Sequence, residues 1–390
     1  MRVRLIELQT ERDSLEAGRA AGRLVDEPNL RGWAALLPLE PKGVVEGLKA
    51  AGVPVLRGSR GALAIGNLAQ LWGASRSLAD ALERPESRAL AQELLERTAA
   101  LEAAGSAIGL SAGSWTLPRT QLPTGRTLIM GVVNVTPDSF SDGGRFLDPA
   151  AAVAHGLRLI EEGADLLDVG GESTNPFVSQ PVDAAEERRR TEPVVRELVR
   201  QARVPISIDT TKSEVAEAAL DAGAEIVNDV SGLARDPRLG SLAAARGAAL
   251  VLMHMRGTPQ TMSGLATYAD LHAEVLAELD EALERARAAG FADDRVLLDP
   301  GLGFAKAAGH SLSLLRRQRE LLQLGRPLLV GPSRKSFIGK ATGKPPEARL
   351  AGTLAACAIS AAAGAAIVRV HDVKEVRDAL AVADAVRGAR

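Results

Sequence analysis

The chain has 390 residues, which is long for one small domain and sufficient for two. With 46% hydrophobic and 25% charged residues, its composition indicates an ordinary globular protein and excludes disordered and fibrous classes. The formal net charge of −2 gives no support to bulk nucleic-acid binding. The single cysteine, Cys357, excludes an intramolecular disulfide and a cysteine-based zinc cluster, and its small apolar neighbours predict a buried thiol.

Two segments bear on the location of the protein. The N-terminal residues contain no apolar core followed by a cleavage site, so we expect no secretion signal. The stretch from Leu350 to Val368 is uncharged and long enough to span a bilayer, but it consists mainly of Ala, Gly, Ser and Thr. We therefore expect a packed helix rather than a membrane span, and a soluble protein in the cytoplasm.

Residues 1–117 predict a small α/β module, because they read as short strands and helices that end in a long helix. No nucleotide-binding loop or metal-ligand spacing is recognisable there, and its role is not readable from the sequence. The tryptophans of the chain all lie in this part, which predicts a core of its own: Trp33, Trp72 and Trp115.

Residues 118–127 predict a linker, because Pro118, Pro123 and Gly125 interrupt any helix. In residues 128–390, short apolar or β-branched runs alternate with amphipathic helices, and the length is close to that of a (β/α)₈ barrel. The sequence therefore predicts a TIM barrel preceded by the small α/β module. The expected strands lie at 127–135, 165–170, 204–209, 224–229, 248–254, 295–299, 327–331 and 365–371.

Polar side chains cluster at the C-terminal ends of these runs, where the active sites of barrel enzymes are built. Helix caps would explain the Asn and Asp residues among them, but not the basic ones. The cluster comprises Asn134, Asp168, Glu172, Asp209, Asn228, Asp229, His254, Asp299, Lys335, Arg369 and His371.

Two groups of these residues have readable chemistry. Carboxylate and amide groups such as Asp209, Asn228 and Asp299 suit a planar heterocycle rich in N–H donors, although each could instead cap a helix or bind a metal. Arg369 and His371 lie on alternate residues and so point to one side of the last strand, which favours an anion site.

Two further segments support an anionic substrate. The segment from Ser333 to Ser336 follows the seventh strand and begins a helix, a usual position for a phosphate site in barrels. Asn134 precedes a loop rich in Pro, Ser, Asp and Gly, and its amide oxygen suits a hard cation such as Mg²⁺. A turn residue is the alternative interpretation of Asn134.

About two thirds of the chain, residues 127–387, resembles the dihydropteroate synthase family. The resemblance rests on an ordered set of motifs, in which a hyphen stands for one residue of any type: NVTPDSFSDGG, DVGGEST-P, IDT-K, NDVSG, LMHMRGTP, DPGLGF-K, SRKSFIG and RVHDV. It implies a transferase of folate biosynthesis that condenses 6-hydroxymethyl-7,8-dihydropterin pyrophosphate with 4-aminobenzoate to give 7,8-dihydropteroate and pyrophosphate. It also implies Mg²⁺ as cofactor and the tendency of the family to form homodimers.

The resemblance assigns roles to individual residues. The implied pterin-binding residues are Asp209, Asn228, Met253, Asp299, Gly331 and Lys335. The implied pyrophosphate-binding residues are Asn134, which would also hold Mg²⁺, Arg369 and His371. The implied aminobenzoate-binding residues are Phe140, Thr174, Pro176, Phe304 and Ser336. The implied catalytic residues are Asp142, Asp209, Lys335, Arg369 and His371.

The chain departs from the family pattern in the second loop. Where the family usually has Ser-Thr-Arg-Pro-Gly, this sequence has Asn175 in place of the arginine and Phe177 in place of the glycine. Two alternatives therefore stay open: a pterin-dependent methyltransferase on the same barrel, and a non-catalytic pterin-binding paralogue that acts through the N-terminal module. The anion motifs SRKSFIG and RVHDV argue against the methyltransferase.

Overall fold

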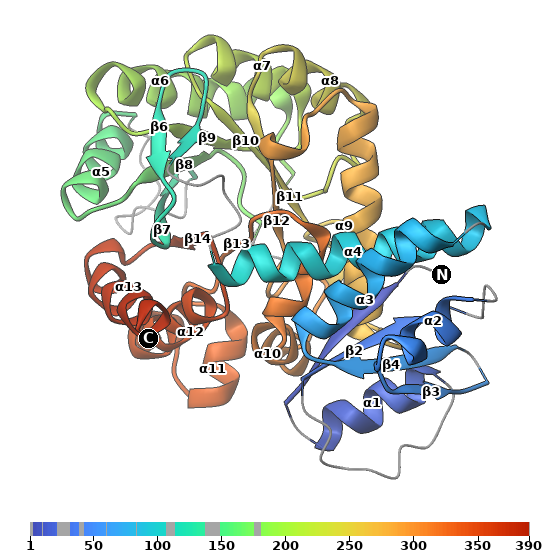
Figure 1. Ribbon diagram of the computed structural model, residues 1–390. Coiled ribbons are helices and arrows are strands. Elements are labelled where there is room, and N and C mark those ends of the chain that lie inside the picture. The colour runs from blue at the N-terminus through green and yellow to red at the C-terminus, as the bar shows by residue number, and fades with distance from the viewer. Residues whose placement is uncertain are drawn as a thin grey trace. The chain divides into compact units, whose positions relative to one another are not determined.

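The computed structural model describes residues 3–9, 11–21, 32–38, 43–59, 61–82, 84–106, 114–136, 149–174 and 181–389. Contacts divide the chain into two compact units (Figure 1). The first consists of Met1–Ser106 together with Arg319–Gly325, and the second of Ala107–Gln318 together with Arg326–Arg390.

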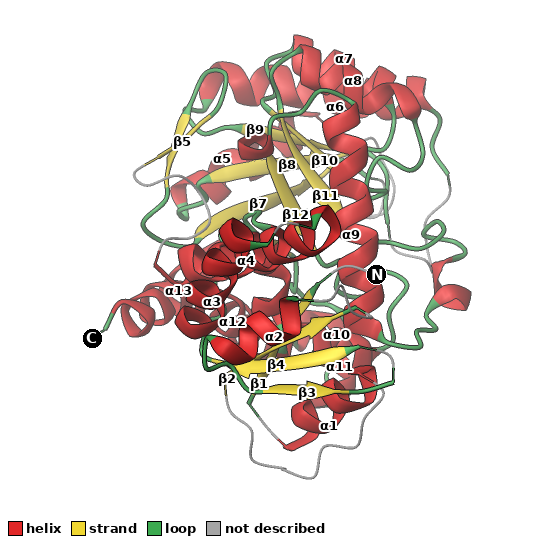
Figure 2. Ribbon diagram, turned by 45° about the vertical axis from the view of Figure 1, so that its right-hand side comes forward, coloured by secondary structure: helices red, strands yellow, loops and turns green. Residues whose placement is uncertain are grey.

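The first unit is a four-stranded antiparallel sheet with strand order β1-β2-β4-β3. Alternate residues of the strands, such as Ile6, Ala34 and Leu63, pack against α1 on one face of this sheet (Figure 2). The other helices are α2, α3 and α4. The elements are β1 (Arg4–Leu8), α1 (Glu11–Ala21), β2 (Gly32–Leu37), α2 (Val44–Ala50), β3 (Val55–Arg57), β4 (Ala62–Gly66), α3 (Leu68–Ala81) and α4 (Pro85–Ser106).

The edge strand β1 is completed by the segment Arg319–Gly325, which is distant in sequence. The side chain of Gln323 accepts a hydrogen bond from the Leu5 backbone N–H at 2.8 Å and donates one to the Leu5 carbonyl at 3.0 Å. Two residues along the strand, the Glu7 N–H donates to Glu320 Oε1 at 3.0 Å. These side chains form hydrogen bonds with backbone N–H and C=O groups of β1 that could otherwise pair with another strand.

The second unit contains a parallel eight-stranded sheet with order β12-β11-β10-β9-β8-β7-β14-β13, and a parallel bridge between Leu298 and Leu328 closes it into a barrel. All eight strands expected from the sequence are confirmed. They are β7 (Leu128–Asn134), β8 (Leu166–Gly170), β9 (Ile206–Asp209), β10 (Ile226–Asp229), β11 (Ala249–Met253), β12 (Val296–Asp299), β13 (Leu329–Val330) and β14 (Ile367–Val370).

Helices surround the barrel strands (Figure 1). Several begin at a side-chain cap: Asp270 accepts from the Ala273 N–H at the start of α9, and Asp183 accepts from the Glu186 N–H at the start of α6. The helices are α5 (Pro149–Glu161), α6 (Ala184–Gln201), α7 (Ser213–Asp221), α8 (Pro237–Ala245), α9 (Leu271–Ala288), α10 (Ala308–Arg316), α11 (Ser336–Thr342), α12 (Leu350–Ala362) and α13 (Val373–Gly388).

The uncharged stretch 350–368 divides into helix α12 and the start of strand β14, as expected for a packed helix. Gly364 lies between them with a φ of 92°, a conformation that glycine adopts without strain. Among the described residues, no helix is both long and apolar enough to cross a membrane. Cys357 of α12 is buried, and burial raises the pKa of its thiol to about 12.

A β-hairpin formed by β5 (Ser114–Thr116) and β6 (Gln121–Pro123) packs in the core of the barrel unit. Its Trp115 and Leu122 pack in one cluster with residues at the N-terminal ends of the barrel strands, such as Leu128 and Ile226. The expectation that all three tryptophans belong to the N-terminal core is therefore wrong for Trp115. The predicted linker, 118–127, contains β6 and the turn that precedes it.

Glu225, which is buried just before β10, fixes this hairpin. Its carboxylate accepts hydrogen bonds from the backbone N–H groups of Arg119 at 2.6 Å and Thr120 at 3.0 Å, and from the Thr120 hydroxyl at 3.0 Å. A single carboxylate thus satisfies both N–H groups at the turn and ties it to the barrel.

We expect Glu225→Ala to lower the free energy of unfolding by about 2–3 kcal/mol, because it leaves partly buried backbone donors without an acceptor. Urea denaturation measures the loss, and hydrogen exchange over residues 114–123 should become faster. The control is Glu217→Ala on α7, whose ion pair with Arg246 is exposed and contributes little. Equal stability of the two variants would contradict the anchoring role of Glu225.

Candidate functional site

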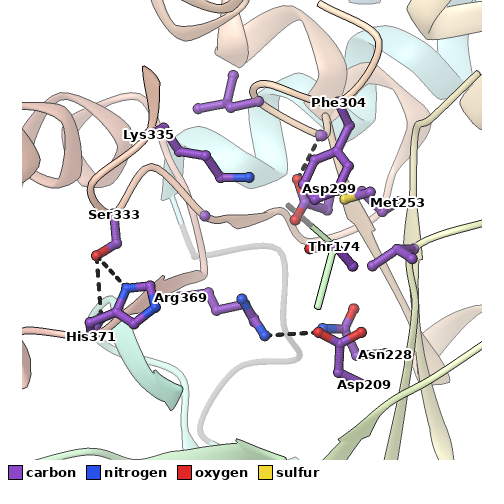
Figure 3. Close-up of a pocket in the computed structure, with 14 residues that line it drawn as sticks. Thr174, Asp209, Asn228, Met253, Asp299, Phe304, Ser333, Lys335, Arg369 and His371 are labelled. Atoms are coloured by element: carbon purple, nitrogen blue, oxygen red, sulfur yellow. Dashed lines mark hydrogen bonds and ion pairs between the residues drawn. The ribbon is translucent and has the colours of Figure 1, made fainter. Parts of the chain in front are cut away.

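A cavity opens at the C-terminal ends of the barrel strands (Figure 3). It has about 490 Å³ of space, including the part that is open to solvent. Most of the residues expected from the sequence line it. The lining residues are Thr174, Asp209, Asn228, Val230, Met253, Asp299, Gly301, Leu302, Phe304, Gly331, Ser333, Lys335, Arg369 and His371.

Arg369 crosses the barrel interior from β14 and binds two carboxylates. Its Nε donates to Asp168 Oδ2 at 2.6 Å, and its Nη2 donates to Asp209 Oδ2 at 2.9 Å. Asn228 Nδ2 also donates to Asp168 Oδ2, at 3.0 Å. Burial disfavours the charged guanidinium, but the two carboxylates outweigh this effect and raise the pKa of Arg369. Arg369 is therefore a fixed cation, and three of its five N–H donors lie outside these two bonds.

Two carboxyl groups face the cavity from β9 and β12. Burial raises the pKa of Asp209 to about 7. The positive charge of Arg369 opposes this shift, and the negative charge of Asp168 adds to it. Burial also raises the pKa of Asp299, although its Oδ1 accepts a hydrogen bond of 2.7 Å from the Gly301 N–H. A ligand with N–H donors would favour the ionised forms of both groups, because it would replace lost solvation with hydrogen bonds.

Lys335 brings a second positive charge to the cavity. It lies between β13 and α11, and its Nζ is 4.0 Å from the centroid of the Phe304 ring. Burial lowers the pKa of Lys335 to about 8, although Asp299 opposes the shift. Lys335 and Phe304 therefore form a cation–π pair on the same side of the cavity as Asp299.

Ser333 orients His371 at the edge of the cavity. The Ser333 hydroxyl lies 3.0 Å from His371 Nδ1 and accepts a hydrogen bond from the His371 backbone N–H at 3.3 Å (Figure 3). Burial and the neighbouring Arg369 lower the pKa of His371 to about 4, so the imidazole is neutral at pH 7. Arg334, the residue after Ser333, adopts a φ of 55° and pairs with Asp372.

Asn134 is the last residue of β7 and is half-buried, but it does not line the described cavity. Strand pairing places it level with Asp209, because Gly170 of β8 pairs with both. Mg²⁺ commonly takes one or two oxygens from a protein and the rest from substrate phosphates and water. The amide oxygen of Asn134 at this position fits such a site.

The remaining residues expected from the sequence are placed differently. Ser336 begins α11 and is exposed, and it does not line the cavity. Three expected site residues and the two departures from the family pattern lie outside the described residues: Phe140, Asp142 and Pro176, and Asn175 and Phe177. Their assignment by resemblance stays a prediction.

The structure gives specific roles to two residues that the sequence placed only in the polar cluster or in the expected anion segment. Asp168 lies in the middle of β8 and holds Arg369, and Ser333 holds His371. A sequence signal for Asp168 existed, because a carboxylate inside one buried strand and an arginine inside another both need a partner. The apolar lining residues, by contrast, carry no signal that separates them from core residues: Val230 and Leu302.

These groups together can hold an anion beside a planar molecule rich in N–H donors. Arg369 and Lys335 supply positive charge, while Asp209 and Asp299 supply hydrogen-bond acceptors at the ends of strands β9 and β12. Met253 and Phe304 supply apolar walls against which a flat ring could lie.

Comparisons with known proteins agree with this chemistry. Residues 130–371 match a family described as pterin binding enzyme. The chain is 47% identical over 262 residues to a dihydropteroate synthase of Synechocystis, covering 67% of this chain and 90% of the relative. Two solved structures of dihydropteroate synthase from Xanthomonas albilineans are also similar, each with a TM-score of 0.65.

One of these structures, in complex with 7,8-dihydropteroate, is 45% identical and covers 71% of this chain and 100% of that chain. The other, with 4-aminobenzoic acid, is 47% identical and covers 70% of this chain and 100% of that chain. The chain therefore belongs to the dihydropteroate synthase family of pterin-binding enzymes.

Proposed function

We propose that this protein is a transferase that condenses 6-hydroxymethyl-7,8-dihydropterin pyrophosphate with 4-aminobenzoate, giving 7,8-dihydropteroate and pyrophosphate. The observation that carries the proposal is the convergence of two cations, Arg369 and Lys335, with two carboxyl groups, Asp209 and Asp299, on one cavity. The arrangement suits a substrate that joins a polyanion to an N–H-rich ring. The kinship of the chain with dihydropteroate synthases supports the same reaction.

The pyrophosphate end would lie beside Arg369 and His371. When the bond between the pterin methylene and its oxygen breaks, the departing pyrophosphate gains negative charge, and a preorganised cation stabilises it without reorganisation. The carboxylates of Asp168 and Asp209 already fix the guanidinium of Arg369. Neutral His371 can donate one N–H to a phosphate oxygen, and an adjacent polyanion would favour its protonation.

The pterin end would lie between Asp209, Asn228 and Asp299. Loss of pyrophosphate leaves positive charge on the methylene and the ring, which nearby ionised carboxylates stabilise. The amine of 4-aminobenzoate then forms the new C–N bond and releases one proton. Because an arylamine is itself a nucleophile, the reaction needs no covalent intermediate on the enzyme.

We propose Mg²⁺ as the cofactor, held by the amide oxygen of Asn134 together with pyrophosphate oxygens of the substrate. When bound there, the ion would neutralise charge on the leaving group. Asn134 would orient the pyrophosphate from β7, the strand next to β14, from which the guanidinium reaches into the cavity.

Assembly rests on the family resemblance, and location on the lack of a recognisable secretion signal in the sequence. We propose a cytoplasmic homodimer, and light scattering during size-exclusion chromatography measures its mass.

Mixing the purified protein with both substrates and Mg²⁺ tests the activity. We expect pyrophosphate release that requires 4-aminobenzoate and yields 7,8-dihydropteroate. A methyltransferase would release no pyrophosphate, and a non-catalytic paralogue would bind the pterin substrate without turnover. Either result would overturn the proposal.

Arg369→Ala should cost about 2–4 kcal/mol of transition-state stabilisation, by analogy with the loss of one preorganised charge-stabilising donor. Steady-state kinetics give this as a fall in kcat/KM for the pterin substrate. The control is Arg246→Ala, which breaks the exposed ion pair with Glu217 and should leave kcat/KM unchanged. An Arg369→Ala enzyme with the wild-type kcat/KM would remove Arg369 from the pyrophosphate site.

Asp299→Asn should weaken pterin binding by at least about tenfold, because the amide keeps the shape of the side chain but replaces one acceptor oxygen with an N–H donor. Calorimetric titration with the pterin substrate or with the pterin alone measures the change. The same substitution at the exposed Asp294 is the control and should leave the affinity unchanged. Equal affinity of both variants would mean that Asp299 does not contact the ring.

A further inference from the structure

Lys306 is a buried lysine behind the cavity, 8% exposed and outside the set of lining residues. Its ammonium group lies 2.7 Å from His254 Nδ1 and donates to the backbone carbonyls of Phe304 at 2.9 Å and His254 at 3.3 Å. An ammonium group has three donors, and these three acceptors match them in number. Lys306 thus ties the end of β11 to the loop that follows β12.

The ring of His254 is held as an acceptor for Lys306. Its Nε2 lies 2.9 Å from Glu278 Oε2, on α9. Burial and the charge of Lys306 lower the pKa of His254 to about 4, so the imidazole carries one proton at pH 7. Burial would raise the pKa of Glu278, but the bonds from His254 and Arg256 outweigh it and hold this pKa at about 2. The proton of His254 therefore lies on Nε2, and Nδ1 accepts from Lys306.

The loop that Lys306 holds has little freedom of its own. Ala305 adopts a φ of 48°, which is uncommon for a residue with a side chain. The Tyr268 hydroxyl donates to the Ala305 carbonyl at 2.9 Å, while Lys306 binds the carbonyl just before it. A Cβ atom on Gly301 would clash with the His254 carbonyl, so this loop and the end of β11 lie in close contact. The successive backbone carbonyls of Phe304 and Ala305 are thus both held by hydrogen bonds, from Lys306 and Tyr268.

The residue presented by this turn is Phe304, whose ring lines the cavity next to Lys335. We propose that Lys306 is a positioning residue that sets the place of Phe304, and through it the binding of the arylamine substrate. The proposal rests on the proposed function, in which 4-aminobenzoate is the second substrate, and on the resemblance, which implies that Phe304 belongs to the aminobenzoate site. Lys306 itself does not touch substrate.

The charge of Lys306 supports this role. Burial lowers the pKa of Lys306 to about 7, so the ammonium form and its third donor are lost as pH rises through neutrality. The KM for 4-aminobenzoate should therefore increase with pH in this range. The titratable and charged groups that face Lys306 are His254, Arg256, Glu278, Asp299 and Lys335.

Lys306→Met tests the proposal, because methionine fills a similar volume without donating. We expect the KM for 4-aminobenzoate to rise by about tenfold from the displaced ring, with kcat changed by less than about threefold. Pterin affinity by calorimetry should be retained, because Lys335 stays beside Asp299. Lys340→Met, on the exposed face of α11, is the matched control and should behave as wild type.

Lys306→Arg separates charge from shape. Arginine stays protonated, so the Lys306→Arg enzyme should have a lower KM for 4-aminobenzoate than the Lys306→Met enzyme. This KM should not increase between about pH 6.5 and 8.5, as the wild-type value does. Asp209 and Lys335 titrate nearby in all variants, so only the difference between variants counts. If Lys306→Met is poorly folded by thermal denaturation, the pH profile of Lys306→Arg decides.

A well-folded Lys306→Met enzyme would overturn the positioning role if its KM for 4-aminobenzoate were unchanged, or if kcat and both KM values changed together. So would a Lys306→Arg enzyme that keeps the wild-type pH dependence. Failure of the proposed function shows differently, because the wild-type protein would then release no pyrophosphate from the two substrates.

Discussion

The bonds from the Arg369 guanidinium to Asp168 and Asp209 are the interaction on which the site depends. A buried cation is costly unless carboxylates accompany it, and here they come from strands β8 and β9 while the arginine comes from β14. The partners are 201 and 160 residues apart in sequence. The contact that compensates the buried charge therefore also joins the last barrel strand to the early ones.

The same principle organises the rest of the cavity. Lys335 lies beside Asp299 as Arg369 lies beside Asp209, so each anionic group has a cationic neighbour. Such a cavity has little net charge, but it presents fixed positive and negative regions to a substrate whose two ends differ in charge. Orientation of the substrate then follows from where each sign lies rather than from overall attraction.

The barrel could be predicted from the sequence because its signals are local. Each strand is a short apolar run, and several of them end in a polar residue, such as Asn134, Asp209 and Asp299, which falls on the rim by the geometry of parallel strands. What could not be predicted depends on contacts between distant segments. Trp115 packs under the barrel, and its hairpin is fixed by Glu225, which lies 106 residues after its hydrogen-bond partner Arg119. Asp168 and Lys306 act through partners that no local pattern identifies.

The pairing of Gln323 with Leu5 has a consequence for synthesis of the chain on the ribosome. The two residues are 318 positions apart, so the edge strand β1 has no Gln323 to pair with until most of the barrel has been synthesised. At about 5–20 residues per second, this delay lasts roughly 15–60 s. During that time the unpaired edge of β1 is open to pairing with a neighbouring nascent chain, and a chaperone that covers this edge would prevent such pairing.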